Sequence, residues 1–550
     1  MALTDEQLIE AGVRGGLIER HVLERLRIEA RRQRLPLLGI VQARYRFPLS
    51  ALYRAVAEQR GIAYVDLNLL PIDSDSLKKL PPSLVRRKLL LPVVDREQAL
   101  LVVADPNDRA TIDTAQRLLG KPSLLAMADL PSLQLKISQS LAGKAGPADS
   151  ETVWVEEDTD LVLLLDTIVR DAYYNRASDI HLLTETAGLR VRLRVDGKLR
   201  DYPVDANSAV SAALVSRVKV LSGLDIAEQR MPQDGGFSYH LAPPIDKAFN
   251  IRVATAPTRL GERVTMRLLG QESGGLSLTE LGMLDDDLHQ FRKAIHKPYG
   301  MILLTGPTGS GKSTTLCAAL QEINSPDINI MTVENPIEYV IDGISQIQTG
   351  PKIGFADALR SFLRHDPDVL MVGEIRDHET ADVAVKAAMT GHMVFSTLHT
   401  NNAVSAVTRL IDIGCEPFLI GSTMTAVIAQ RLVRRLCLHC RKSRITSREE
   451  LLELGAEEES LEIFEPVGCA ACQGSGFRGR LGLFETLWFD EKLARMIARG
   501  ADEEALEAGA GGRLRFMWED GCRKVRLGLT TLDELRNVAV HKSRDMQEPN

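Results

Sequence analysis

Short apolar runs alternate with helical patterns through the second half of the chain. The uninterrupted apolar segments at 301–304, 369–372 and 393–395 have the composition of strands that are buried on both faces. Runs with helix-forming composition lie between them, such as 314–323. This alternation is typical of a doubly wound parallel sheet with helices on both of its faces. We therefore expect an α/β domain over residues 276–545.

The first half of the chain has a different pattern. Residues 1–141 mix charged helical segments with short apolar strands, and we expect a small regulatory or docking domain there. Residues 142–153 are mostly small and polar and read as a linker. An α+β domain is expected over 154–270, with a hairpin turn at Asp196-Gly197. A glycine-rich hinge at 270–275 separates it from the α/β domain.

Composition and charge narrow the class of protein. The chain has 550 residues, 44% hydrophobic and 26% charged, which suits about three or four globular domains. We find no apolar run that reaches the roughly 18 residues of a membrane span, and no signal-peptide pattern at the start. We therefore expect a cytoplasmic protein whose membrane contact is peripheral and made through partners. The net charge of −7 argues against extensive nucleic-acid binding.

A glycine-rich turn lies between the apolar run at 301–304 and the helical run that follows it. Glycines let backbone N–H groups converge on an anion, and the helix N-terminus adds partial positive charge. Lys312 is expected to reach the β- and γ-phosphates, and the Ser313 hydroxyl to ligate Mg²⁺. The strand and helix on either side favour a nucleoside triphosphate site over a chance match. The predicted nucleotide-binding residues are Gly306, Pro307, Thr308, Gly309, Ser310, Gly311, Lys312, Ser313 and Thr314.

Polar residues follow three further apolar strands, and the carboxyl ends of parallel strands share one edge of a sheet. Glu374 suits Mg²⁺ coordination through water or polarisation of the attacking water, and Glu334 competes for the base role. His392 and His399 are candidate sensors of the γ-phosphate. Taken singly, each carboxylate fits a cap or a surface ion pair equally well, and each histidine fits a structural role better. Their convergence favours a phosphoryl-transfer site that includes Lys312.

Several segments resemble the type II secretion and type IV pilus assembly ATPases, over about residues 155 to 540. The segments that carry the resemblance are 306–313, 332–339, 363–377, 390–401, 177–181, 231–235, 254–258 and 528–531. It implies a RecA-like P-loop NTPase domain preceded by a PAS-like α+β domain, assembled as a homo-hexamer. It further implies Mg²⁺-dependent ATP hydrolysis at the cytoplasmic face of the inner membrane. The expected partner is an inner-membrane platform protein, and the work is pilin or pseudopilin assembly or protein export.

The resemblance also assigns residues outside the strand edge. In such ATPases, arginines of the domain before the motor contact the phosphates, and Arg252 and Arg267 match best here. Arg217 and Arg230 match less well, and a solvated strand face explains all four arginines equally well. Asn335 stands where the family usually has Asp, so the turnover rate is left open.

Four cysteines form two Cys-x-x-Cys pairs, Cys437 with Cys440 and Cys469 with Cys472. Each pair can place two thiolates on a tetrahedral Zn²⁺ site. We expect a closed structural zinc site within a subdomain at 433–477, with four unligated thiols as the alternative. Secretion and pilus assembly members of the resembled family often carry such a subdomain.

Two other functions stay open at this point. A hexameric nucleic-acid translocase would use the cysteine pairs to hold DNA, although the acidic charge and few aromatic residues argue against it. A nucleotide-gated scaffold would bind ATP without turnover. The N-terminal region resembles the platform-binding domain of the family loosely. Cyclic di-GMP is not expected there, because Leu37-Leu38-Gly39 lacks an adjacent arginine, although Arg34 is close.

Overall fold

The computed structural model describes residues 3–33, 37–45, 48–67, 70–95, 98–120, 123–142, 153–204, 206–241, 247–269, 277–456 and 458–540. The chain forms two compact units, the first mainly from Met1–Gln271 and the second from Glu272–Val467 and Gly476–Asn550. Residues 143–152 of the expected linker and the glycine-rich segment at 270–275 lie outside the described residues.

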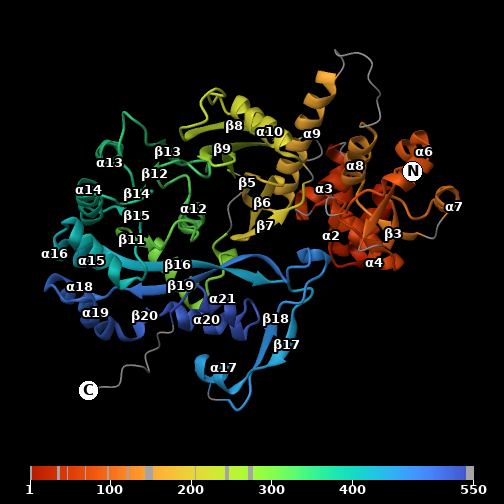
Figure 1. Cartoon of the computed structure of the whole chain (residues 1–550). Coiled ribbons are helices and arrows are strands. Elements are labelled where there is room, and N and C mark those ends of the chain that lie inside the picture. Colours follow the sequence, from red (N-terminus) through yellow and green to blue (C-terminus); the bar gives the residue numbers. More distant parts are fainter. Residues whose placement is uncertain are drawn as a thin grey trace. The chain divides into compact units, whose positions relative to one another are not determined.

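The first unit begins with a four-stranded sheet accompanied by helices (Figure 1). Its strand order is β1 (Ala63–Tyr64), β4 (Leu124–Met127), β3 (Gln98–Val103), β2 (Leu90–Asp95). The helices are α1 (Asp5–Arg14), α2 (Arg20–Gln33), α3 (Leu37–Tyr45), α4 (Leu49–Arg60), α5 (Ser74–Lys79), α6 (Pro82–Lys88), α7 (Arg109–Leu119) and α8 (Leu130–Ala142).

The second part of this unit is a six-stranded antiparallel sheet in the order β7-β6-β5-β10-β9-β8. Its elements are α9 (Val153–Tyr174), β5 (Ala177–Glu185), β6 (Gly188–Val195), β7 (Lys198–Tyr202), α10 (Ser208–Leu221), β8 (Gln233–Leu241), β9 (Lys247–Thr258) and β10 (Gly261–Leu268). Ile168 of α9 and Leu214 of α10 share a core with Ile180 of β5. The turn expected at Asp196-Gly197 joins β6 to β7, and both residues have positive φ angles, 49° and 85°.

The second unit contains an eight-stranded sheet in the order β13-β12-β14-β15-β11-β16-β19-β20. The six strands from β13 to β16 in that order are parallel; β19 pairs antiparallel with β16, and β20 pairs antiparallel with β19 at the edge of the sheet. The strands are β11 (Gly300–Thr305), β12 (Ile330–Glu334), β13 (Ser345–Gln348), β14 (Val369–Val372), β15 (Met393–Leu398), β16 (Met424–Leu436), β19 (Phe477–Trp488) and β20 (Leu514–Arg515).

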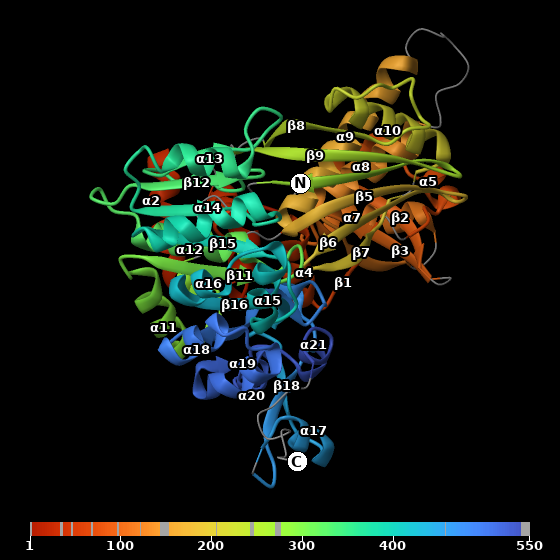
Figure 2. The same ribbon diagram turned by 90° about the vertical axis from the view of Figure 1, so that its left-hand side faces the viewer.

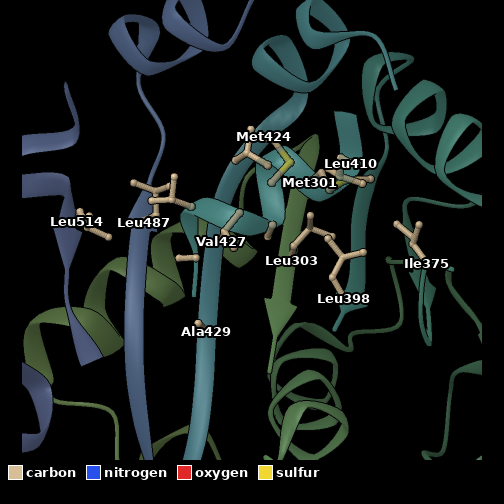
Figure 3. Close-up of a cluster of buried hydrophobic side chains, with 14 of the residues drawn as sticks. Met301, Leu303, Ile375, Leu398, Leu410, Met424, Val427, Ala429, Leu487 and Leu514 are labelled. Carbon is tan, nitrogen blue, oxygen red and sulfur yellow. The ribbon is translucent and has the colours of Figure 1, made fainter. Parts of the chain in front are cut away.

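Helices cover both faces of this sheet. They are α11 (Asp285–Ile295), α12 (Lys312–Ile323), α13 (Phe355–Phe362), α14 (His378–Met389), α15 (Val404–Ile413), α16 (Pro417–Thr423), α18 (Glu491–Ala498), α19 (Glu503–Ala510), α20 (Met517–Arg526) and α21 (Leu532–Arg536). Within β11, Met301 and Leu303 pack on one face with Leu398 of β15 (Figure 3). Ile302 and Leu304 pack on the other face, against α11 and α12. Burial on both faces explains the apolar runs and confirms the doubly wound sheet.

A small hairpin extends from the second unit between β16 and β19. It consists of β17 (Lys442–Ile445) and β18 (Glu462–Glu465), paired antiparallel, with α17 (Arg448–Glu453) between them. Figure 2 shows α17 and β18 beyond α20, away from the large sheet. Among the described residues, we find no helix with both the length and the apolar character needed to cross a bilayer.

Candidate nucleotide site and cysteine cluster

The glycine-rich turn forms a tight loop between β11 and α12. Gly306 has a φ of 142° and Gly311, the N-cap of α12, a φ of 92°. A Cβ atom on Gly306 would lie 2.4 Å from the carbonyl oxygen of Gln430, so glycine is required there. No side chain caps α12 by a hydrogen bond, so its first N–H groups are available to an anion.

Lys312 begins α12 with its ammonium folded over the loop. Its Nζ donates to the carbonyl oxygens of Gly306, at 2.7 Å, and Pro307, at 3.0 Å. Burial lowers the pKa of Lys312, while the carboxylates of Glu374 and Glu338 act in the opposite direction. A cation is therefore held at the loop, within the electrostatic reach of two acidic residues.

Glu374 and His399 meet at the carboxyl edge of the sheet. They follow β14 and β15, and β15 lies between β14 and β11 with all three strands parallel, so both residues lie on the edge that carries the loop. His399 Nε2 lies 3.3 Å from Glu374 Oε2, and Arg376 Nη2 lies 2.6 Å from Glu374 Oε1. The Glu374 side chain is 13% exposed, so water can still reach this carboxylate.

Two hydroxyl side chains of β15 fix the backbone around Glu374. Thr397 Oγ1 donates to the carbonyl oxygen of Gly373 at 2.7 Å, and the N–H of Ile375 donates to the carbonyl oxygen of Thr397 at 3.0 Å. Ser396 Oγ donates to the carbonyl oxygen of Val372 at 2.8 Å. The residues on either side of Glu374 are thus both bound to Thr397. Sequence reasoning missed this role, although a Ser-Thr pair inside an apolar strand was a visible signal.

Glu334, at the end of β12, is held by its own neighbours. Thr332 Oγ1 and Gln346 Nε2 both donate to Glu334 Oε1, each at 2.8 Å. The residue is only 5% exposed, and burial raises the pKa of its carboxyl group. Its carboxylate is therefore more enclosed than that of Glu374.

The two histidines lie at opposite ends of β15. His392 precedes the strand, and its Nδ1 lies 2.9 Å from the carbonyl oxygen of Ala387. Six residues of strand separate it from His399, a length of roughly 20 Å. The structure therefore groups His399, and not His392, with Glu374.

Arg252 and Arg267 belong to the first unit. They are register partners on β9 and β10, and both are exposed. Arg267 Nε donates to Asp179 Oδ1 at 2.8 Å, which holds its guanidinium along the sheet surface.

The four predicted cysteines form one cluster. The Sγ atoms of Cys437, Cys440, Cys469 and Cys472 all lie within 4.8 Å of one another. The Sγ atoms of Cys469 and Cys472 are 3.8 Å apart, close to the about 3.8 Å expected for thiolates on a tetrahedral zinc ion. Each pair spans a tight turn in which the N–H of the second cysteine donates to the carbonyl oxygen of the first at 3.2 Å. The cluster thus has the ligand type, number and spacing of a structural zinc site.

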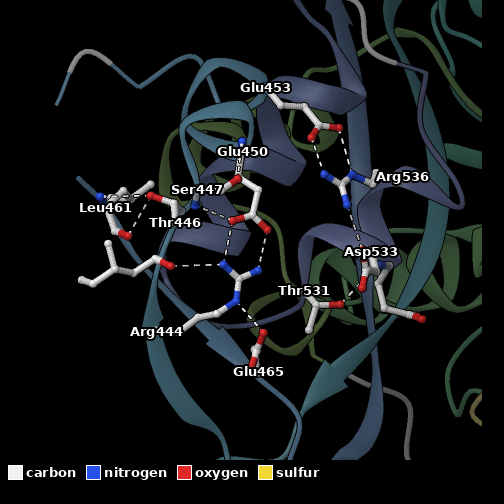
Figure 4. A network of polar contacts seen from close by, with 12 residues as sticks. Arg444, Thr446, Ser447, Glu450, Glu453, Leu461, Glu465, Thr531, Asp533 and Arg536 are labelled. Carbon is white, nitrogen blue, oxygen red and sulfur yellow. Dashed lines mark hydrogen bonds and ion pairs between the residues drawn. The ribbon is translucent and has the colours of Figure 1, made fainter. Parts of the chain in front are cut away.

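Ion pairs stabilise the hairpin and attach it to the C-terminal helices (Figure 4). Arg444 Nη1 donates to Glu450 Oε2 at 2.6 Å, and Arg444 Nε donates to Glu465. The Arg444 guanidinium lowers the pKa of Glu450 to about 2. Arg536 of α21 donates from Nε to Glu453 Oε1 of α17 at 3.0 Å. The hairpin is therefore attached to the second unit by charged hydrogen bonds.

Comparison with known families gives two matches along the chain. Residues 155–537 match the family model described as "Type II/IV secretion system protein", which is more than half of the chain. The chain belongs to the type II/IV secretion system protein family. Residues 60–146 also match the model of the MshEN domain.

Curated relatives in this family are similar over most of their length. The chain is 47% identical to the type II secretion system ATPase E of Vibrio cholerae, over 71% of this chain and 78% of that protein. It is 38% identical to the type IV pilus assembly ATPase PilB of Myxococcus xanthus, over 87% of this chain and 89% of that protein. The Legionella pneumophila ATPase DotB matches in fold, with a TM-score of 0.52 at 23% identity, over 68% of this chain and 95% of that chain.

Proposed function

We propose that this chain is a Mg²⁺-dependent ATPase in which water attacks the γ-phosphate of ATP to give ADP and phosphate. The observation that supports this most is the shared sheet edge, where the glycine-rich loop with Lys312 lies beside the Glu374–His399 pair. Relatives in the same family are named as ATPases. Phosphoryl transfer needs little covalent chemistry from the protein, so positioning and charge are what this edge must supply.

We propose a catalytic role for each of these residues at the carboxyl edge of the sheet. The Lys312 ammonium exchanges its loop carbonyls for the β- and γ-phosphate oxygens, and Ser313 offers a hydroxyl to Mg²⁺, which neutralises phosphate charge. Glu374 orients and polarises the attacking water, and His399 holds the Glu374 carboxylate in place. Glu334 is the second choice for the base because its Oε1 already accepts two hydrogen bonds.

Steady-state phosphate release tests these roles. Lys312→Ala and Glu374→Gln should each reduce turnover to about a hundredth or less of wild type, because each removes a charge from the transition state. Lys352→Ala and Glu379→Gln, which change exposed residues of the second unit, are the matched controls and should retain activity. Near-normal turnover in either site variant would refute the assignment. Binding of ATP without turnover in the wild type would favour the nucleotide-gated scaffold.

We propose that the cysteine cluster holds one structural Zn²⁺ per chain, supplied with four thiolates by Cys437, Cys440, Cys469 and Cys472. Metal analysis of the purified protein should find close to one zinc per chain, and Cys437→Ser should lower that content. Cys415→Ser, at a buried cysteine outside the cluster, should not change it. A zinc content well below one per several chains would contradict the proposal.

We propose that the protein works as a homo-hexamer at the cytoplasmic face of the inner membrane and drives pilin or pseudopilin assembly, or protein export, through a platform protein. The support is the similarity to ATPases named for type II secretion and type IV pilus assembly. In the hexamer, Arg252 and Arg267 would contact the phosphates. Arg252→Ala and Arg267→Ala should then raise the KM for ATP. The full chain should gain ATPase activity with membrane vesicles that carry its platform protein, and should not respond to DNA.

A further inference from the structure

Thr305 is the last residue of β11 and the immediate neighbour of Gly306, the first residue of the phosphate loop. It is completely buried, in a strand whose preceding residues Met301 to Leu304 are all apolar. A hydroxyl in such a position requires hydrogen-bond partners, since an unpaired one is costly. Its partners all lie on the segment that carries His399.

The Thr305 hydroxyl oxygen lies within hydrogen-bond distance of both chain neighbours of His399. Thr305 Oγ1 lies 3.2 Å from the carbonyl oxygen of Leu398. It lies 2.7 Å from Thr400 Oγ1, and the N–H of Thr400 donates to it at 2.8 Å. His399 therefore lies between two residues that contact the same hydroxyl group.

One arrangement of the protons satisfies both hydroxyl groups. Thr400 Oγ1 donates its own proton to the carbonyl oxygen of Asn402 at 3.1 Å. The Thr305 hydroxyl can then donate to Thr400 Oγ1 while it accepts from the N–H of Thr400. Each hydroxyl thus donates once and accepts at least once, in a chain that runs from β11 into the turn after His399.

We propose that Thr305 is a positioning residue that couples the phosphate loop to His399. A movement of Gly306 on nucleotide binding is carried through the Thr305 hydroxyl to Thr400, and thereby to the imidazole that contacts Glu374. This inference rests on the proposed function, in which His399 orients Glu374. The buried Thr305 hydroxyl would thereby link nucleotide binding at the loop to the orientation of the Glu374 carboxylate, which polarises the attacking water.

Thr305→Val keeps the shape of the side chain and removes the hydroxyl, whereas Thr305→Ser keeps the hydroxyl and is the matched control. Thr305→Val should lower kcat by about tenfold or more, since small misplacements of a catalytic group are costly, while KM stays within about twofold. The control variant Thr305→Ser should retain most of the wild-type activity. Thr400→Val, in a partly exposed loop, removes the contact between the two hydroxyl groups and keeps the N–H of Thr400, so it should lower kcat selectively but by less than Thr305→Val does.

Combination with His399→Ala separates this inference from the proposed function. If Thr305 acts through His399, adding Thr305→Val to His399→Ala should change kcat by less than about twofold. If the kcat losses of Thr305→Val and His399→Ala multiply in the double variant, the inference is overturned. It is also overturned if Thr305→Val weakens ATP affinity as much as it lowers kcat. If His399→Ala alone is as active as wild type, the proposed role of His399 fails. If His399→Ala loses activity and Thr305→Val and Thr400→Val do not, the inference alone fails.

Discussion

Replacement of Gln430 by methionine should destabilise the second unit at the base of the phosphate loop. Gln430 is a buried polar residue of β16, and its Oε1 accepts from Thr315 Oγ1 of α12 at 2.9 Å. Its Nε2 lies 2.7 Å from the position that a Cβ on Gly311 would occupy. The Gln430 side chain thus connects β16 to the first turn of α12.

The size of the effect follows from that single contact. Methionine has nearly the same length as glutamine, but its thioether sulfur is only a weak acceptor, which leaves a buried hydroxyl without its strong partner. An unpaired buried polar group costs about 1–3 kcal/mol, which lowers the folding equilibrium constant of the unit by roughly five- to 150-fold. Adding Thr315→Val removes the unpaired hydroxyl and should recover most of that loss.

Urea unfolding followed by tryptophan fluorescence measures this effect, because Trp488 and Trp518 both lie in the second unit. Gln290→Met, at an exposed position of α11, is the matched control and should leave the midpoint unchanged. Wild-type stability in Gln430→Met would refute the reasoning. So would a double variant that is less stable than the single one.

Three further outcomes are expected. Gly306→Ala should abolish ATP binding measured by fluorescent-nucleotide titration, because its Cβ would lie 2.4 Å from the Gln430 carbonyl oxygen; retained affinity would contradict the loop geometry. The pKa of Glu450 is lowered from 4.5 to about 2, so the Arg444–Glu450 ion pair stabilises the folded protein above pH 4.5 and this stability is lost as the pH falls toward 2; Arg444→Met should therefore weaken the pH dependence of the unfolding midpoint between pH 4.5 and about 2, and an unchanged slope would argue against the ion pair. If the cysteine cluster holds the proposed zinc, a chelator should increase proteolysis of residues 433–477 before that of the sheet, and equal cleavage rates would contradict a structural metal.

The fold of the second unit could be predicted because its signals are local. An apolar run followed by a glycine-rich turn and a helix-forming run identifies β11, the loop and α12 from one stretch of sequence. Ser447 is the N-cap of α17 and forms a capping box with Glu450, which is another signal that can be found within a few residues of sequence. The Asp196-Gly197 turn follows from the preference of these residues for positive φ.

The hydrogen bonds that hold the site in place could not be predicted in the same way. Thr305 and Thr400 are 95 residues apart, and Gln430 and Thr315 are 115 residues apart. Hydrophobic periodicity gives the face on which a residue lies and carries no information about its partner on another strand. Polar residues inside apolar strands were the available signal, and only the strand order shows which of them meet.

The histidines illustrate a related difficulty. His392 and His399 belong to one sequence motif, so they were expected to serve one site. The six residues of β15 between them extend along the strand and place them at opposite edges of the sheet. Two residues seven positions apart along a strand are therefore far apart in space. The same spacing on a helix would have brought the two histidine side chains to one face of that helix.

Retention of radiolabelled ATP by the purified full chain, with Mg²⁺ present, shows whether the glycine-rich loop binds and turns over a nucleotide. We expect the wild type to bind ATP saturably and to convert it to labelled ADP and phosphate, and Lys312→Ala to lose that binding. A wild-type protein that retains no ATP above the level of Lys312→Ala would contradict the claim that the glycine-rich loop is a nucleotide site.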